Sequence, residues 1–93
     1  MPTRREILVE YLRSAPHTSR ELAELCGMRV RDVIDDLEHI RRSHRRDLVI
    51  EPAKCSQCDF VFRKRDKLGT PSRCPTCRNE RIRGPWLHLR QRP

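Results

Sequence analysis

The chain has 93 residues, a length that allows one ordinary domain or two very small ones and excludes a large enzyme. Its 21 Lys and Arg outnumber its 13 Asp and Glu, which leaves a formal charge of +8 at pH 7. Such an excess favours an acidic partner, for example a phosphate polymer. No apolar run approaches the roughly 20 residues of a membrane-spanning helix, and no secretory signal is visible. We therefore expect a cytoplasmic protein that makes no membrane contact.

Two capping signals near the N-terminus each predict a helix. Thr3 and Thr18 are both followed three residues later by a glutamate, and this pairing satisfies backbone NH groups at the start of a helix. Apolar residues at helical spacing then extend the first helix to Ser14, before Pro16. Gly27 is expected to end the second helix, because glycine readily adopts the left-handed conformation that closes one.

A third helix is predicted from about residue 29 to residue 43, with one apolar face. Two helices joined by a short glycine-containing turn form a helix-turn-helix, whose second helix lies in the major groove of DNA. Arg29 and Arg31 are placed to approach that groove. Acidic residues flank the apolar face and oppose DNA, so a structural or protein-facing helix remains an open alternative. These acids are Asp32, Asp35, Asp36 and Glu38.

Four of the five cysteines occur as two C-x-x-C pairs with 15 residues between them: Cys55 with Cys58, and Cys74 with Cys77. This spacing is typical of a tetrahedral zinc site in which each pair supplies two thiolates. Disulfides are disfavoured in a reducing compartment, and a thioredoxin-like dithiol needs a βαβ pattern that is not visible. Four protein ligands leave no open position for a substrate, so we expect one structural Zn²⁺ per chain and no enzyme activity.

The paired cysteines interrupt a predicted hairpin. Residues 48–51 read as a strand, and the next credible strand is residues 86–90, whereas a hairpin wing normally returns within a few residues. The economical interpretation is an insertion between the two wing strands. We therefore predict an α+β fold in which residues 1–51 and 86–93 form a winged helix-turn-helix and residues 52–85 form a zinc ribbon.

The inserted ribbon has too few large apolar side chains for a core of its own, so the metal is predicted to supply its folding energy. Structural zinc contributes about 10 to 16 kcal/mol to small peptides at neutral pH. The basic, turn-rich segment 63–71 between the cysteine pairs is expected to be an exposed loop. Cys26, the remaining cysteine, is expected to be a buried thiol on an apolar helix face.

The single tryptophan lies on the closing strand. If Leu87 and Leu89 point into the helical core, strand alternation turns Trp86 and His88 to the other side. Packing of Trp86 against the ribbon is the favoured interpretation, and stacking on a nucleic acid is the alternative. The four histidines form no spaced cluster with carboxylates, so we expect no second metal site among them.

The positive charge is concentrated in the second half of the chain. Residues 1–47 hold 10 basic and 9 acidic side chains, whereas residues 48–93 hold 11 and 4. Because Lys and Arg that neutralise phosphates drive much of nucleic-acid affinity, the ribbon is predicted to contact phosphates, with a merely solubilising face as the alternative. The candidate residues are Arg63, Lys64, Arg65, Lys67, Arg73, Arg78, Arg81 and Arg83.

The order of a helix-turn-helix, a strand, two cysteine knuckles and a closing strand resembles a group of small winged-helix proteins. These prokaryotic, chiefly archaeal, proteins carry a rubredoxin-like zinc ribbon inserted in the wing. The resemblance covers nearly the whole chain, from the segment TSRELAEL through RCPTC to WLHL. It implies a winged-helix fold, zinc on the four paired cysteines and a role in transcription. Where such knuckles often carry glycine, this chain has Asp59 and Arg78, of which aspartate tolerates a left-handed backbone better.

These observations predict a DNA-binding transcriptional regulator whose partner is duplex DNA. One alternative is an adapter that docks on a protein of the transcription machinery through the acidic third helix or the ribbon. A second is an iron-binding, rubredoxin-like electron carrier, because four thiolates also accept iron. No small-molecule substrate is expected, and a homodimer remains an open arrangement.

Overall fold

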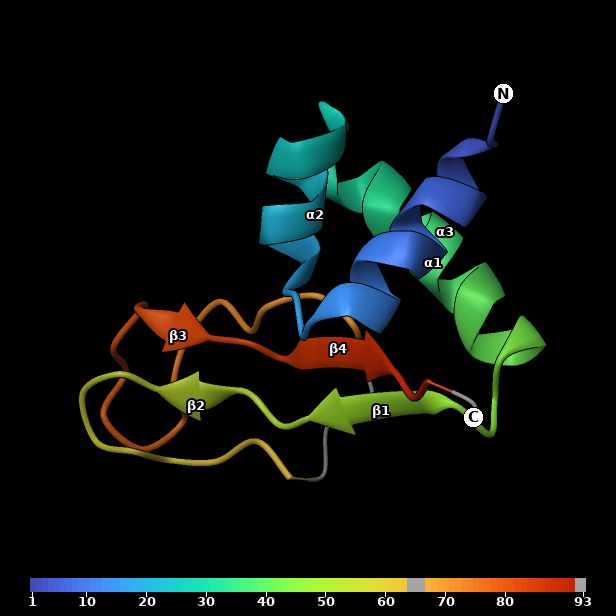
Figure 1. The fold of residues 1–93 in the computed structure, drawn as a ribbon. Helices are drawn as coiled ribbons and strands as arrows, with labels where there is room; N and C mark the ends of the chain where they lie inside the picture. Colours follow the sequence, from blue (N-terminus) through green and yellow to red (C-terminus); the bar gives the residue numbers. More distant parts are fainter. Residues whose placement is uncertain (64–66, 92–93) are drawn as a thin grey trace.

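The computed structural model describes residues 1–63 and 67–91. Three helices come first in the chain and gather on one side of the molecule, above a thin arm of paired strands (Figure 1). The helices are α1 (Arg4–Ser14), α2 (Ser19–Cys26) and α3 (Val30–Ser43). The strands are β1 (Leu48–Glu51), β2 (Lys54–Cys55), β3 (Ile82–Arg83) and β4 (Trp86–Leu89). The mixed α+β arrangement predicted from the sequence is confirmed. Within the described residues, no helix has the length and apolar character needed to cross a membrane.

The helix ends follow the capping signals in the sequence. The Thr18 side chain accepts the backbone NH of Glu21, while the Glu21 side chain accepts the NH of Thr18, so the capping box is complete. At the start of α1, the Thr3 side chain accepts the NH of Glu6. Gly27 closes α2 with a left-handed φ of 62°.

Segments far apart in the sequence lie side by side in the arm. Strand β1 pairs with β4 in antiparallel fashion, with Glu51 opposite Trp86, and β2 pairs with β3, with Lys54 opposite Arg83. The pairing of residues 48–51 with the run that begins at residue 86 is therefore confirmed. Because β2 follows β1 and β3 precedes β4, the segment that carries the cysteines extends one long hairpin away from the helices (Figure 1).

The main core lies between the helices and one face of β4. Leu87 and Leu89 are buried in it, whereas Trp86 and His88 are only half-buried, which is the alternation that the sequence predicts. The other members come from all three helices, and one comes from the loop between the cysteine pairs. The core residues are Leu8, Leu12, Leu22, Ala23, Val33, Leu37, Ile40, Leu68, Leu87 and Leu89.

The segment between the cysteine pairs is not simply an exposed loop, and this expectation is wrong for part of it. Leu68 is 1% exposed and belongs to the helical core, and Pro71 is also buried. Beside Leu68, a Cβ placed on Gly69 would lie 3.1 Å from the Cδ1 atom of Ile34 in α3. The basic composition of the segment conceals one apolar anchor, which ties the ribbon to the helices.

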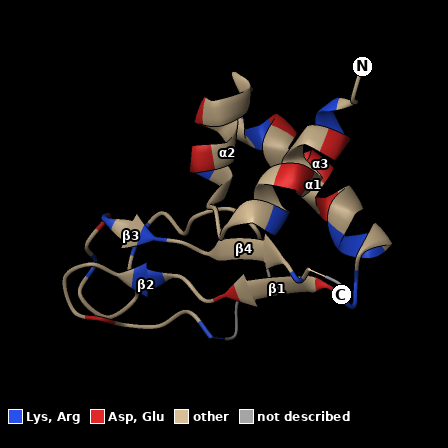
Figure 2. Ribbon diagram, viewed as in Figure 1, with Lys and Arg blue, Asp and Glu red and all other residues tan. Residues whose placement is uncertain are grey.

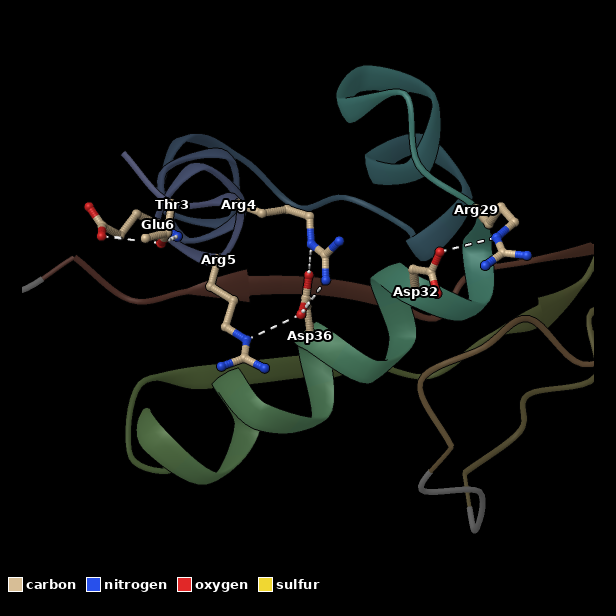
Figure 3. A network of polar contacts seen from close by, with 7 residues as sticks. All are labelled: Thr3, Arg4, Arg5, Glu6, Arg29, Asp32 and Asp36. Atoms are coloured by element: carbon tan, nitrogen blue, oxygen red, sulfur yellow. Dashed lines mark hydrogen bonds and ion pairs between the residues drawn. The ribbon is translucent and has the colours of Figure 1, made fainter. Parts of the chain in front are cut away.

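A buried carboxylate joins α1 to α3. The Asp36 side chain is 2% exposed, and its two oxygens lie 2.6 Å from Nε of Arg4 and 3.1 Å from Nε of Arg5 (Figure 3). Burial by itself raises the pKa of Asp36, but hydrogen bonds and charge from the two arginines outweigh burial and lower it. The expectation that Asp36 is one of four acids that oppose DNA is therefore corrected, because Asp36 faces α1 and not solvent.

Truncation of the anchor in the ribbon should destabilise the helices. We expect Leu68→Ala to lower the free energy of unfolding by about 3 kcal/mol, because it leaves a cavity in the helical core. Urea unfolding followed by the helical circular dichroism signal measures this change. Leu25→Ala is the matched control, because Leu25 is 51% exposed and should cost no more than about 0.5 kcal/mol. Equal effects of the two substitutions would contradict the buried position of Leu68.

The pairing of Asp36 predicts that removal of the two arginines destabilises the fold more than removal of the carboxylate charge. Arg4→Ala/Arg5→Ala leaves a buried carboxylate without compensation and should cost about 3 kcal/mol at about pH 7. Asp36→Asn should cost less, because the two arginines are about half-exposed and regain water. Urea unfolding of the three proteins gives the order, and a larger cost for Asp36→Asn would overturn it.

Lowering the pH should reduce the difference in the free energy of unfolding between the natural chain and the double variant Arg4→Ala/Arg5→Ala. In the natural chain the pKa of Asp36 is lowered, so its pairing stabilises the fold above the unfolded pKa of about 3.9 and is lost as the pH falls through the folded value. In the double variant burial raises that pKa, so stability returns as the pH falls through the raised value. When the double variant also carries Asp36→Asn, no carboxyl titrates at this site. The same pH change should then leave its difference in unfolding free energy from the natural chain no smaller.

Candidate metal centre

Each cysteine pair forms a tight backbone turn. The NH of Asp59 donates to the carbonyl of Cys55 at 3.2 Å, and the NH of Arg78 donates to the carbonyl of Cys74 at 2.9 Å. Asp59 and Arg78 both have left-handed backbones, with φ of 61° and 62°. Arginine at the position where glycine is common therefore does not prevent the second knuckle from closing.

The two knuckles bring four sulfurs together. The Sγ atoms of all four paired cysteines lie within 4.8 Å of one another, with Cys55 and Cys77 3.5 Å apart and Cys58 and Cys74 3.6 Å apart. A tetrahedral zinc ion with Zn–S bonds of about 2.3 Å holds its sulfurs about 3.8 Å apart. The cysteines therefore form a zinc-ribbon site that fits one structural Zn²⁺, as the sequence predicts. Within the described residues, no second group of metal-ligating side chains forms.

The first cysteine of each pair is the better thiolate. Burial raises the pKa of Cys74, but the NH groups of Cys77 and Thr76, together with neighbouring thiols, lower it to about 6. The pKa of Cys55 is lowered in the same way, because the NH groups of Cys58 and Gln57 outweigh the effect of burial. Backbone amides that point at sulfur stabilise its negative charge.

The second cysteine of each pair resists ionisation while no metal is bound. The NH of Phe60 lowers the pKa of Cys58, but burial and the three nearby sulfurs raise it to about 12. The pKa of Cys77 is also raised, because burial and the thiols of Cys55 and Cys74 outweigh the NH of Asn79. Four thiolates at this separation repel one another, so a divalent cation is what allows all four to lose their protons.

A small apolar cluster surrounds the sulfurs. Cys55 and Cys74 are buried with Ala53 and Ile82, and the rings of Phe60 and Phe62, which contact each other edge to face, pack against this cluster. An additional bond joins the two knuckles, because the side-chain amide of Asn79 donates to Oε1 of Gln57 at 2.9 Å. The sequence offered no periodic signal for this contact.

The basic candidates lie on different parts of the molecule, and Figure 2 shows Lys and Arg on both ribbon strands and along the neighbouring loops. Arg63 and Lys67 line one pocket together, whereas Arg73 forms an ion pair with Glu80 at 3.4 Å. Lys64 and Arg65 lie outside the described residues. The other ribbon candidates, Arg78, Arg81 and Arg83, are exposed.

The two remaining candidates, Arg29 and Arg31, lie at the start of α3. Arg31 is exposed, and Nε of Arg29 lies 3.2 Å from a carboxylate oxygen of Asp32 (Figure 3). Both positions agree with the helix start expected from the sequence.

Other clustered basic residues were not among the candidates predicted from the sequence. Arg13 of α1 meets Arg45 and Arg46 around a pocket of about 460 Å³ beyond the C-terminal end of α3. The charge count by halves of the chain missed this cluster, because only the fold brings these segments together. Lys54 was missed as well, although its place next to Cys55 at the base of a knuckle was a usable signal.

Loss of one ligand should release the metal. We expect Cys74→Ser to lower zinc content from one ion per chain to almost none, because only three thiolates remain. Amide signals of the ribbon should collapse to unfolded positions in the same variant. Cys26→Ser is the control, because Cys26 packs against the helical core and should leave zinc content unchanged. Full zinc content in Cys74→Ser would contradict the four-thiolate site.

Comparison with known proteins identifies both parts of the chain. The family described as PF0610-like, N-terminal, matches residues 3–49, and the PF0610 rubredoxin-like zinc beta-ribbon domain matches residues 52–92. The solution NMR structure of protein PF0610 from Pyrococcus furiosus is 33% identical in sequence, with a TM-score of 0.74. The similarity covers 96% of this chain and 90% of that one. None of the curated proteins compared matches the chain. The chain therefore belongs to the PF0610-like family, with that family's N-terminal domain followed by its rubredoxin-like zinc β-ribbon.

Proposed function

We propose that this chain is a winged helix-turn-helix protein that binds duplex DNA in transcription regulation. Zinc is structural in this proposal, and no reaction is catalysed. Two features support it: α2 and α3 are joined by a short turn that begins at Gly27, and the paired strands β1 and β4, which serve as the wing in this proposal, follow them in the chain. The observation that carries the proposal is the set of exposed cations on the ribbon, which extends that hairpin.

These cations are available to phosphates. Among the described cations of the ribbon, Arg73 is the one that forms an ion pair, with Glu80. Arg81 directly precedes strand β3 and Arg83 lies in it, and both are exposed, as are Arg63 and Lys67. Neutralisation of phosphates by such side chains releases counterions and favours binding.

The acidic residues of α3 oppose DNA less than their number indicates. Asp36 is withdrawn into the contact with α1, and Glu38 lies 3.4 Å from Arg41. Asp32 pairs with Arg29, but the Arg29 side chain is 75% exposed, and exposed pairs contribute only about 1 kcal/mol or less. Exchange of that carboxylate for a phosphate is therefore inexpensive, and Arg31 next to it is exposed.

The ribbon restricts how α3 meets DNA. Gly69 lies against Ile34 in the second turn of α3, with Leu68 buried beside it. In the proposed complex, the first turn of α3 approaches the groove, where Arg29 and Arg31 face base edges or phosphates. The ribbon cations supply most of the electrostatic attraction.

The salt dependence of binding tests this proposal. Fluorescence anisotropy of a labelled duplex should show binding at low salt, with a log–log slope against salt of about −0.9 per phosphate neutralised. Arg81→Ala/Arg83→Ala should make that slope shallower by about 2. The control Arg45→Ala/Arg46→Ala removes equal charge from the opposite end and should leave the slope unchanged. No binding at low salt would refute the proposal, and a change in slope with the control would place the contact elsewhere.

One observation favours the adapter function as a second candidate. Leu25 is 51% exposed and Val30 is 37% exposed, so two large apolar side chains flank the turn between α2 and α3. A protein partner whose capture survives nuclease treatment, and is lost with Leu25→Asp/Val30→Asp, would support the adapter. The iron-carrier alternative has no comparable observation in its favour.

A further inference from the structure

A groove separate from the metal centre lies where the two paired strand segments meet. Its volume is about 530 Å³, within the range of sites that hold small ligands or single side groups. Four of its lining residues are apolar and three are charged. They are Pro16, Pro52, Val61 and Trp86, with Glu51, Lys54 and Arg63.

Trp86 provides a fixed aromatic surface in this groove. Its neighbours Leu87 and Leu89 are buried, so β4 is anchored and its alternation turns Trp86 away from the helical core. A Cβ placed on Gly84 would lie 3.0 Å from Cε3 and Cζ3 of the Trp86 ring, so part of the ring rests against the ribbon backbone. The packing that the sequence favours for Trp86 is therefore present, and the side chain still lines the groove.

Trp86 also lies outside both cores. It belongs to neither of the two clusters of buried residues, the one between the helices and the one around the sulfurs. A large aromatic side chain that is half-buried beside a groove, and that completes no core, is free to contact a ligand.

Cations flank the aromatic surface. Lys54 and Arg63 line the groove with one carboxylate, that of Glu51. Arg83 is paired across the hairpin with Lys54, and all three cations are exposed. A single aromatic ring beside cations is the arrangement that binds a stacked base together with its phosphates.

We propose that this groove binds an unpaired nucleotide of single-stranded DNA, with the base on Trp86 and the adjacent phosphates at Lys54 and Arg63. The inference rests on the proposed function only in its assumption that the partner is DNA. It assigns a second DNA contact, distinct from the proposed contact of α3 with a duplex. A peptide fits less well, because the described groove offers one aromatic ring and an excess of positive charge. The protein would then bind best where a duplex adjoins an unpaired strand.

The fluorescence of the protein reports on this site directly, because Trp86 is the only tryptophan. Titration of the zinc-loaded chain with a short oligothymidylate should quench that fluorescence to saturation, since stacking of a base on the indole ring quenches it. A blunt duplex of equal nucleotide content should quench it much less. Equal quenching by the two DNAs, or none by the oligothymidylate, would overturn the proposal.

Variants separate stacking from general attraction. Trp86→Ala should weaken binding of a labelled oligothymidylate about tenfold in anisotropy, because one stacked base contributes that much. The same variant should change binding of a blunt duplex by no more than about twofold. Trp86→Phe keeps a smaller ring in the same place, so an intermediate affinity is expected even if the alanine variant folds poorly. An unchanged affinity in Trp86→Phe and Trp86→Ala would refute a stacking role.

The flanking charges have a matched control. Lys54→Ala/Arg63→Ala should weaken single-strand binding and make its salt slope shallower by about 1.5, on the single-strand value of about 0.7 per phosphate. Arg45→Ala/Arg46→Ala removes the same charge far from the groove and should leave quenching unchanged. Equal effects of the two pairs would contradict a local phosphate contact.

The outcomes distinguish this inference from the proposed function. Duplex binding without preferential quenching by the single strand would overturn the groove proposal and leave the duplex proposal standing. Saturable quenching by the single strand without duplex binding would do the reverse. Quenching by polyglutamate as strong as that by oligothymidylate, at the same salt concentration, would show that the groove takes an acidic peptide and would also overturn the nucleotide proposal.

Discussion

Attraction between four thiolates and one divalent cation is the interaction on which the second half of the chain depends. The apolar cluster around the sulfurs contains two of the ligands themselves, Cys55 and Cys74, so little of it remains as a core once the metal is removed. The sulfurs lie so close that their charges repel one another without the ion. Metal binding and folding of the ribbon are therefore one process, as is usual for small metal-dependent modules.

The influence of the metal extends to the helices through the loop that the knuckles enclose. Leu68 lies between Cys58 and Cys74 in the chain but packs in the helical core. The knuckles hold both ends of this loop, and closing a loop in advance lowers the entropy cost of placing its middle. The two family domains are adjacent in sequence, and this contact makes them mechanically dependent on each other.

The features that could be predicted from the sequence are those with a local signal. Cysteine spacing, the Thr18 capping box and the alternation around Leu87 each involve residues that are close in the chain, and the structure confirms all three. Leu68 and Asp36 were misplaced for the opposite reason. Their burial depends on partners that are distant in the sequence, Ile34 beside the loop and Arg4 and Arg5 across the helices. A charged residue gives no sign in the sequence that a distant arginine will cover it.

The positions of the groove cations depend on the metal site, because the two share the short strands β2 and β3. Lys54 precedes the ligand Cys55 and pairs with Arg83, while Cys55 itself pairs with Ile82 in the same two-stranded segment. Gly84 follows directly and carries the ring of Trp86 against it. The metal therefore holds the short β2–β3 pairing in register, and that pairing sets the spacing between the groove cations and the indole. In the proposed complex, zinc controls nucleotide binding without contact with the nucleotide. The indole of Trp86 and the groove cations keep their relative positions only while the knuckles are closed.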